Sequence, residues 1–260
     1  SLNLKQQTQI TVDNKEKFIE EINSGYTFKG DSILLGGAML NGECLTGVSV
    51  KLPLKTMNRH GLIAGATGTG KTKTLQIIAE GLSSASVPVM MMDIKGDLSG
   101  IAKPGTDNDK IKERADKIGI AFSPNGFPVE FLSISDEKGA RLRATVSEFG
   151  PVLFSKMLEL NDTQSGIVSL IFKYCDDNQI PLLDLKDFKK MLQYISDEGK
   201  EEIEKTYGNI STTSTGTILR KVIELEQQKA DTFFGEVSFD VNDLMRIDDQ
   251  GRGVISMLRL

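Results

Sequence analysis

Long apolar runs are absent from this sequence, and so are most of the residues that build metal centres. No run approaches the ~20 residues that a membrane-spanning helix needs, so we expect no contact with a membrane. The two cysteines, Cys44 and Cys175, lie far apart without a CxxC pair, and His60 is the one histidine. This count excludes a zinc site built from cysteine and histidine.

An excess of positive charge and a secretory signal are lacking as well. The net charge of -5 argues against a free-standing basic module that binds nucleic acid, although it leaves room for a local basic channel. The first residues, SLNLKQQTQI, have neither the basic start nor the apolar segment of a secretory signal. We therefore expect a cytoplasmic globular protein.

Residues 1–57 are expected to form a small β-rich N-terminal region. Phe18, Ile19 and Ile22 are spaced as on one face of a short helix that ends at Gly25. The segments SILLGGAML and TGVSVKLPL are bounded by Gly-Gly and Asn-Gly pairs. The second segment alternates apolar residues as a half-buried strand does, so both segments predict strands.

Residues 58–138 change to the alternating strands and helices of an α/β fold. We predict a buried strand in RHGLIAG, a Gly-rich turn, and a helix through KTKTLQIIAEGLSSA. Three consecutive methionines in the next strand, VPVMMMD, cannot all point to one side, so both of its faces should be covered in a parallel sheet. A helix in DNDKIKERADKIG and paired strands IAFS and FPVEFLS, joined across PNG, complete this first part of the core.

Residues 139–235 have an almost wholly helical pattern and predict a helical insertion. Asn161 precedes Gln164 at the spacing of a capping box. Residues 236–260 return to the α/β core, with strand character in GRGVISMLRL that runs to Leu260 without a turn or cap. We expect the fold to continue beyond this residue. Helical spacing in the insertion predicts three buried faces: Ile167, Leu170, Ile171, Tyr174 and Cys175; Leu185, Phe188, Leu192 and Ile195; and Ile218, Val222 and Leu225.

The most specific motif is GATGTGKT at residues 65–72, which matches G-x-x-x-x-G-K-[ST] between a predicted strand and a helix. Its glycines allow left-handed or close-approach backbone, so that successive N–H groups can converge on phosphate oxygens. Lys71 adds a charge at the β and γ phosphates, Thr72 offers a hydroxyl ligand to Mg²⁺, and the helix N-terminus faces the anion. The predicted nucleotide-binding residues are Gly65, Ala66, Thr67, Gly68, Thr69, Gly70, Lys71, Thr72 and Lys73.

Hydrolysis also needs a second acidic group on the metal and a residue that positions water. No Asp-Glu pair follows an apolar strand in this chain. The run VPVMMMD ends in Asp93, whose strand should open onto the same crevice as the phosphate loop, so its charge could reach Mg²⁺ or its waters. The alternative is that Asp93 and Asp97 only cap the following turn.

The residues from Asp93 to Gly96 also fit the D-x-x-G pattern of small GTPases. Four-letter patterns occur often by chance, and the N-K-x-D pattern that reads guanine in that family is absent. A GTPase is therefore disfavoured.

The segments NRHGLIAGATGTGKTKTLQ, MMDIKGDLSGIAKPG and DQGRGVISMLRL together resemble the HerA-like bacterial ATPases of the YjgR type. The helical stretch from TVSEFG to LQYI resembles that family's insertion, and the resemblance covers most of the chain from about residue 30 onward. It implies a RecA-like P-loop NTPase core, in the branch that contains the FtsK and VirD4 translocases. Such proteins typically form hexameric rings that move DNA by hydrolysing ATP.

The resemblance also implies roles for single residues. It places Gly65 to Thr72 at the phosphates and Mg²⁺, and Asp93 near the metal and the attacking water. Arg59 matches an arginine that serves a neighbouring subunit's site, and a surface arginine is the alternative. The expected catalytic residues are Lys71, Asp93 and Arg59. In the family the Asp-Glu strand lies further along than the last strand here, so we expect an N-terminal portion of a longer ATPase.

Three functions remain open at this point. The first is an ATP-hydrolysing motor that acts on DNA as a homo-oligomeric ring; its DNA substrate rests on the resemblance alone, because we find no basic stripe or aromatic stacking platform. The second is a regulatory module in which nucleotide binding orders or closes the helical insertion to control a partner, with little turnover. A GTPase comes third.

Overall fold

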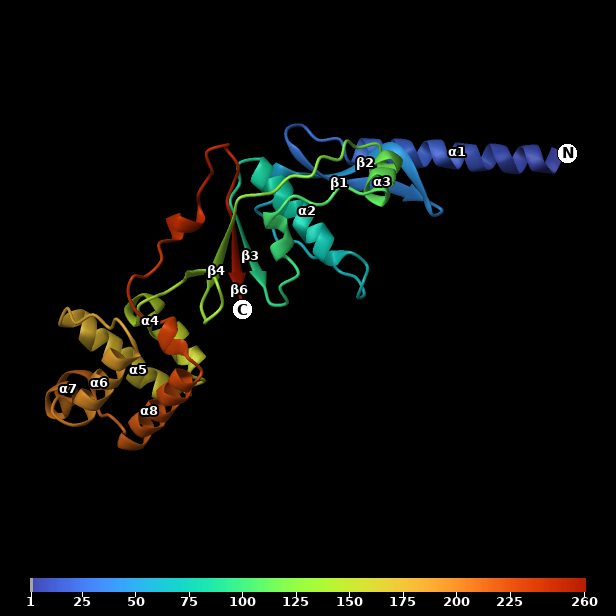
Figure 1. The fold of residues 1–260 in the computed structure, drawn as a ribbon. Helices are drawn as coiled ribbons and strands as arrows, with labels where there is room; N and C mark the ends of the chain where they lie inside the picture. The colour runs from blue at the N-terminus through green and yellow to red at the C-terminus, as the bar shows by residue number, and fades with distance from the viewer. Residues whose placement is uncertain (1) are drawn as a thin grey trace. The chain divides into compact units, whose positions relative to one another are not determined.

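The computed structural model describes residues 2–260, with the side chains from residue 14 onward. The chain divides into two compact units, whose elements are labelled in Figure 1. Unit 1 holds the residues up to Glu130 together with Leu244–Met257, and unit 2 holds Phe131–Asp243 and Leu258–Leu260. None of the described helices is long and apolar enough to cross a membrane. The domain boundaries expected after residues 57, 138 and 235 stay predictions.

Unit 1 begins with a helix and a two-stranded hairpin. Helix α1 (Leu2–Gly25) ends at the predicted residue, but with 24 residues it is not the short helix that was expected. Strands β1 (Ser32–Leu40) and β2 (Glu43–Pro53) pair antiparallel across a turn in which Asn41 and Gly42 have positive φ values of 51° and 83°. The predicted helix end and both predicted strands are confirmed. The helix and hairpin share a small apolar core of Phe18, Ile19, Ile22, Ala38, Leu45 and Val48.

A second sheet has the strand order β3-β6-β4-β5. Its strands are β3 (Val89–Asp93), β4 (Val129–Ser133), β5 (Ala140–Arg141) and β6 (Ile255–Arg259). The Val89 N–H donates to the carbonyl of Val254 at 3.0 Å, and the Ile255 N–H donates to the carbonyl of Pro128 at 2.8 Å. Strands β3, β6 and β4 therefore start side by side and run in one direction (Figure 1), while β4 and β5 pair parallel. The predicted mixed α/β class with a parallel sheet is confirmed.

Helix α2 (Lys71–Ser84) packs against strands β1 and β3, and helix α3 (Asp109–Ile118) also lies in unit 1. A Cβ on Gly81 of α2 would lie 2.4 Å from the Ile33 side chain, so the helix backbone approaches β1 closely. Two residues further along α2, Ser83 forms two hydrogen bonds with Gly253. The Gly253 N–H donates to the Ser83 carbonyl at 2.8 Å, and the Ser83 hydroxyl donates to the Gly253 carbonyl at 2.6 Å. These contacts hold α2 against the start of β6.

Three predictions for this unit are wrong. Residues 61–64 form no strand and are exposed, because no described residue hydrogen-bonds to their backbone, and an extended segment without a partner is not part of a sheet. Met90 and Met92 are 47% and 62% exposed, so only one face of β3 is covered among the described residues. Residues 120–123 form no strand either, because β4 lies between β6 and β5 in the sheet and leaves no edge for a hairpin partner.

Unit 2 is built around five helices, whose buried faces follow the predicted spacing. Phe154, Ile171, Phe188, Ile195 and Ile218 are fully buried in one apolar cluster, and the predicted faces supply about half of its buried members. Asn161 and Gln164 form the predicted capping box. The helices are α4 (Val146–Met157), α5 (Asp162–Asp177), α6 (Leu185–Ser196), α7 (Lys200–Tyr207) and α8 (Thr212–Gln227). Short 3₁₀ turns lie in unit 1 at η1 (Leu54–Thr56) and η2 (Ser99–Ala102), in unit 2 at η3 (Ala230–Thr232), and at the sequence boundary of the units at η4 (Val241–Leu244).

A second capping box closes the N-terminus of α4. The Thr145 backbone N–H and hydroxyl both donate to the Glu148 carboxylate, at 3.0 and 2.8 Å, and the Ser238 hydroxyl donates to it at 2.9 Å. The backbone hydrogen bond from Thr145, then those from the two hydroxyls, lower the pKa of Glu148 below its usual 4.5. The charged carboxylate therefore stabilises this helix start.

Candidate functional site

The phosphate-loop motif adopts the backbone that its glycines were expected to provide. Gly68 and Gly70 have positive φ values of 81° and 95°, a region that residues with a Cβ rarely adopt. Gly65 has a different reason to lack a side chain, because a Cβ there would lie 2.4 Å from the Thr69 hydroxyl oxygen. Helix α2 begins at Lys71, directly after the loop. The loop is therefore a tight turn that leads into a helix N-terminus.

The start of α2 presents a row of free backbone donors. Gly70 caps the helix without a side chain, and the first backbone hydrogen bond of the helix is from Thr74 N–H to the Gly70 carbonyl, at 2.9 Å. The N–H groups of Lys71, Thr72 and Lys73 have no acceptor among the described residues. The first N–H groups of a helix carry its partial positive charge and are a ready site for an anion. This row can bind phosphate oxygens.

Two side chains of the loop converge on one carbonyl oxygen. The Lys71 Nζ donates to the Ala66 carbonyl at 2.7 Å, and the Thr69 hydroxyl donates to the same oxygen at 2.8 Å. The Lys71 ammonium group is therefore held at the Ala66 carbonyl, within the phosphate loop. Because an ammonium group has three donors, it can contact a phosphate oxygen from this position.

The structure brings Thr72 together with Asp97, which sequence reasoning considered only as a turn cap. The Thr72 hydroxyl donates to the Asp97 carboxylate at 3.1 Å, and Asp97 is exposed. The segment between β3 and η2 therefore turns back towards the start of α2. The sequence contains this second acid in DIKGD, four residues after Asp93. The direction in which the Asp97 side chain points depends on the conformation of the turn, which the sequence does not reveal.

Asp93 lies inside that turn. It is 3% exposed, and its carboxylate accepts hydrogen bonds from the N–H groups of Gly96 and Leu98, at 2.8 and 3.3 Å, and from the Ser99 hydroxyl at 3.1 Å. Gly96 has a φ of 75°, which the tight turn requires. These contacts are those of the turn-capping alternative, and the metal-binding role expected of Asp93 stays a prediction.

A buried amide links the turn to α2. The Gln76 side chain is 7% exposed; its Nε2 donates to the Asp97 carbonyl at 3.3 Å, and its Oε1 accepts from the Lys73 Nζ at 2.9 Å. Lys73 also acts on Glu80, whose pKa is raised by burial and lowered in part by the charge of Lys73. Gln76 therefore fixes the main chain of the turn, and it holds the Lys73 ammonium group on the helix side.

Arg59 and His60 precede the loop and are exposed. The Arg59 backbone N–H donates to the Thr56 carbonyl at 3.1 Å, and its guanidinium makes no hydrogen bond or ion pair with the described residues. The role expected of Arg59 at a neighbouring subunit stays a prediction, since the structure holds one chain.

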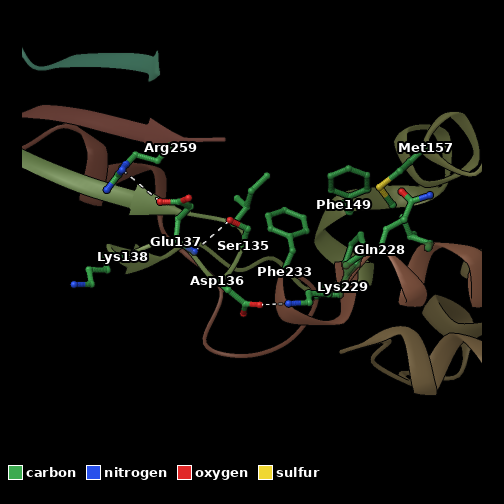
Figure 2. Close-up of a pocket in the computed structure, with 14 residues that line it drawn as sticks. Ser135, Asp136, Glu137, Lys138, Phe149, Met157, Gln228, Lys229, Phe233 and Arg259 are labelled. Carbon is green, nitrogen blue, oxygen red and sulfur yellow. Dashed lines mark hydrogen bonds and ion pairs between the residues drawn. The ribbon is translucent and has the colours of Figure 1, made fainter. Parts of the chain in front are cut away.

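A cavity of about 920 Å³ lies in unit 2, and the residues around it are drawn in Figure 2. Phe149, Phe233 and Met157 are among the apolar residues that line it. Its two carboxylates are both paired, Asp136 with Lys229 and Glu137 with Arg259, the latter at 3.4 Å. The cavity contains none of residues 65–73 of the phosphate loop, so it is separate from the predicted nucleotide site.

Comparison with known proteins identifies one family. The family described as helicase HerA-like C-terminal matches residues 39–260. The chain is also similar in structure to the bacterial conjugative coupling protein TrwBdeltaN70 in its unbound form, at 13% identity and a TM-score of 0.46, with 93% of this chain and 53% of that one covered. For TrwB in complex with the ATP analogue ADPNP, the identity is 12%, the TM-score is 0.48 and the coverage is 92% and 54%. The chain thus spans about half the length of these proteins. No curated protein matches it.

Proposed function

The chain belongs to the helicase HerA-like C-terminal family, and from that premise we propose that it binds Mg-ATP at residues 65–73 and serves as the nucleotide-binding part of a motor ATPase. The observation that carries the proposal is the row of free N–H groups at the start of α2. These groups begin at the end of a complete phosphate-loop motif, in which the Lys71 ammonium group is held at the Ala66 carbonyl. A family match and a local geometry thus point to the same ligand.

The residues present suit Mg²⁺ as well as the nucleotide. Mg²⁺ prefers oxygen ligands and usually binds through one or two carboxylates together with substrate phosphates and water. The Thr72 hydroxyl and the Asp97 carboxylate are oxygen donors 3.1 Å apart. When bound, Mg²⁺ would withdraw charge from the β and γ phosphates. In the proposal Lys71 binds these phosphates, the N–H groups of α2 orient them, and Arg59 acts at a neighbouring site.

The finer functions are part of this proposal. The family's name supports a helicase or DNA translocase, and a homo-oligomeric ring is the assembly in which Arg59 would act on a neighbouring subunit. The net charge of -5 means that any DNA contact must be local. Salt-sensitive binding of DNA by the purified chain in the presence of Mg-ATP is expected for a translocase.

A regulatory module with little turnover is the second candidate. The observation that favours it is the size of unit 2, where five helices pack around their own apolar core. Such a unit could be ordered or closed by nucleotide binding to control a partner. Binding of Mg-ATP that protects unit 2 from hydrogen exchange, without turnover above background, would favour this function over the motor.

The first test is steady-state hydrolysis of ATP by the purified chain, with GTP as a competitor. We expect turnover that depends on Mg²⁺ and is lost in Lys71→Ala, with ATP preferred or equal to GTP. Lys110→Ala is the matched control, because Lys110 is exposed on α3, outside the phosphate loop and the turn after β3. Turnover that persists in Lys71→Ala would contradict the site, and inhibition by GTP far stronger than by ATP would favour the GTPase.

A further inference from the structure

We infer that Asp97 is the carboxylate that acts on the Mg²⁺ of the bound nucleotide. This inference rests on the proposed function and deepens it, because it assigns the acid that the phosphate-loop motif does not contain. It differs from the assignment of Asp93, the acid at the end of the strand. The decisive contact is the hydrogen bond of 3.1 Å between the Thr72 hydroxyl and the Asp97 carboxylate.

The contact matters because of the role that Thr72 has in the motif. The Ser or Thr at this position supplies a hydroxyl ligand to Mg²⁺. A carboxylate that already lies beside this hydroxyl needs no large movement to reach the metal or one of its waters. Asp97 is exposed, so an entering metal meets its carboxylate without displacing the core. Asp93, at 3% exposure, is enclosed by the turn.

The turn fixes Asp97 from two directions. On the inner side, the Asp93 carboxylate holds the N–H groups of Gly96 and Leu98, the two neighbours of Asp97 in the chain. On the helix side, the buried Gln76 side chain donates to the Asp97 carbonyl at 3.3 Å. The main chain on both sides of Asp97 is thus held, which leaves its carboxylate free to face α2. In this arrangement Asp93 maintains the turn and Asp97 meets the ligand.

The test is the dependence of nucleotide affinity on Mg²⁺, which does not require turnover. The dissociation constant of a fluorescent ATP analogue is measured in Mg²⁺ and in EDTA, and the ratio of the two values gives the coupling between metal and nucleotide. Asp97→Asn keeps an oxygen that accepts from Thr72 and removes only the charge. We expect this variant to lose roughly 10- to 100-fold of the coupling, the usual cost of removing an outer partner of a metal site.

Three variants control the experiment. Asp97→Glu keeps the charge and should retain part of the coupling. Asp116→Asn removes an exposed acid of α3 and should leave the coupling at the wild-type value. Asp93→Asn should lower the melting temperature because it weakens a buried acceptor of three hydrogen bonds.

The outcomes separate this assignment from the proposed function. Coupling that is lost in Asp97→Asn and partly kept in Asp97→Glu supports the role of Asp97. Coupling that stays at the wild-type value in Asp97→Asn overturns it, and leaves nucleotide binding by the loop intact. A wild-type chain that binds no nucleotide in either buffer overturns the proposed function, and this inference falls with it.

Discussion

Replacing Gly65 by alanine should weaken nucleotide binding through one specific clash. The new methyl group would lie 2.4 Å from the Thr69 hydroxyl oxygen, which itself donates to the Ala66 carbonyl at 2.8 Å. Because a methyl carbon and a hydroxyl oxygen cannot approach to this distance, the Thr69 hydroxyl must move away from the Ala66 carbonyl. Loss of one such hydrogen bond costs about 0.5–1.5 kcal/mol. If the loop needs this bond to hold its binding conformation, affinity for Mg-ATP falls roughly 2- to 12-fold.

A double-mutant cycle tests this reasoning. With Thr69→Ala the clashing oxygen is gone, and the remaining Thr69 Cβ lies 3.5 Å from the new methyl group, an ordinary contact. Gly65→Ala should therefore cost much less affinity in the Thr69→Ala background than in the wild type. The assay is isothermal titration calorimetry with Mg-ATP. Gly61→Ala is the control, because nothing lies within 4 Å of its added Cβ. Equal costs in the two backgrounds would refute the clash as the cause.

Three further predictions concern the scaffold. Gly253→Ala places a Cβ 2.1 Å from a backbone carbonyl oxygen that cannot rotate away, so scanning fluorimetry should show destabilisation of at least about 1–3 kcal/mol, against little change in Gly100→Ala. Burial raises the pKa of Cys175 to about 11, so at pH 8 a thiol reagent should label Cys44 in the folded chain and reach Cys175 only on unfolding; equal labelling rates would contradict this. The lowered pKa of Glu148 means that its stabilising effect is present above pH 4.5 and is lost as the pH falls through the folded value, so Glu148→Gln should lose less thermal stability than wild type on acidification.

Helices and the phosphate loop could be predicted because their signals are local. Leu185, Phe188, Leu192 and Ile195 repeat at helical spacing, and all four are buried on one side of α6. The loop was predicted from eight consecutive residues, and its glycines have the backbone that the motif implies. In both cases the residues that determine the structure are close in sequence, so one chain segment contains the whole pattern.

The errors concern features that depend on distant partners. The apolar segment around Leu62 reads as a buried strand, but Leu62 is 89% exposed because no described strand pairs with it. The three methionines of β3 predicted that other elements cover both faces of this strand. Met92 is exposed, so the apolar composition of a strand does not reveal which elements pack against its faces.

The position of Asp97 is another feature that sequence alone did not reveal. Spacing placed Asp93 at the end of a strand, where an acid could face the phosphate loop. The direction of each carboxylate is decided by the hydrogen bonds of the turn, which bind Asp93 internally and leave Asp97 at Thr72. Such a choice between two acids four residues apart depends on tertiary geometry, which a motif search does not contain.

Binding of Mg-ATP to the wild-type chain and to Lys71→Ala is the most direct measurement of the central claim, with Lys110→Ala on α3 as the control. A hydrogen bond to a charged group contributes about 1.5–3 kcal/mol, so loss of the Lys71 ammonium group should weaken binding roughly 10- to 150-fold. Lys110→Ala should bind as wild type does. Affinity for Mg-ATP that is the same in Lys71→Ala and in wild type would contradict the assignment of the loop as the nucleotide site.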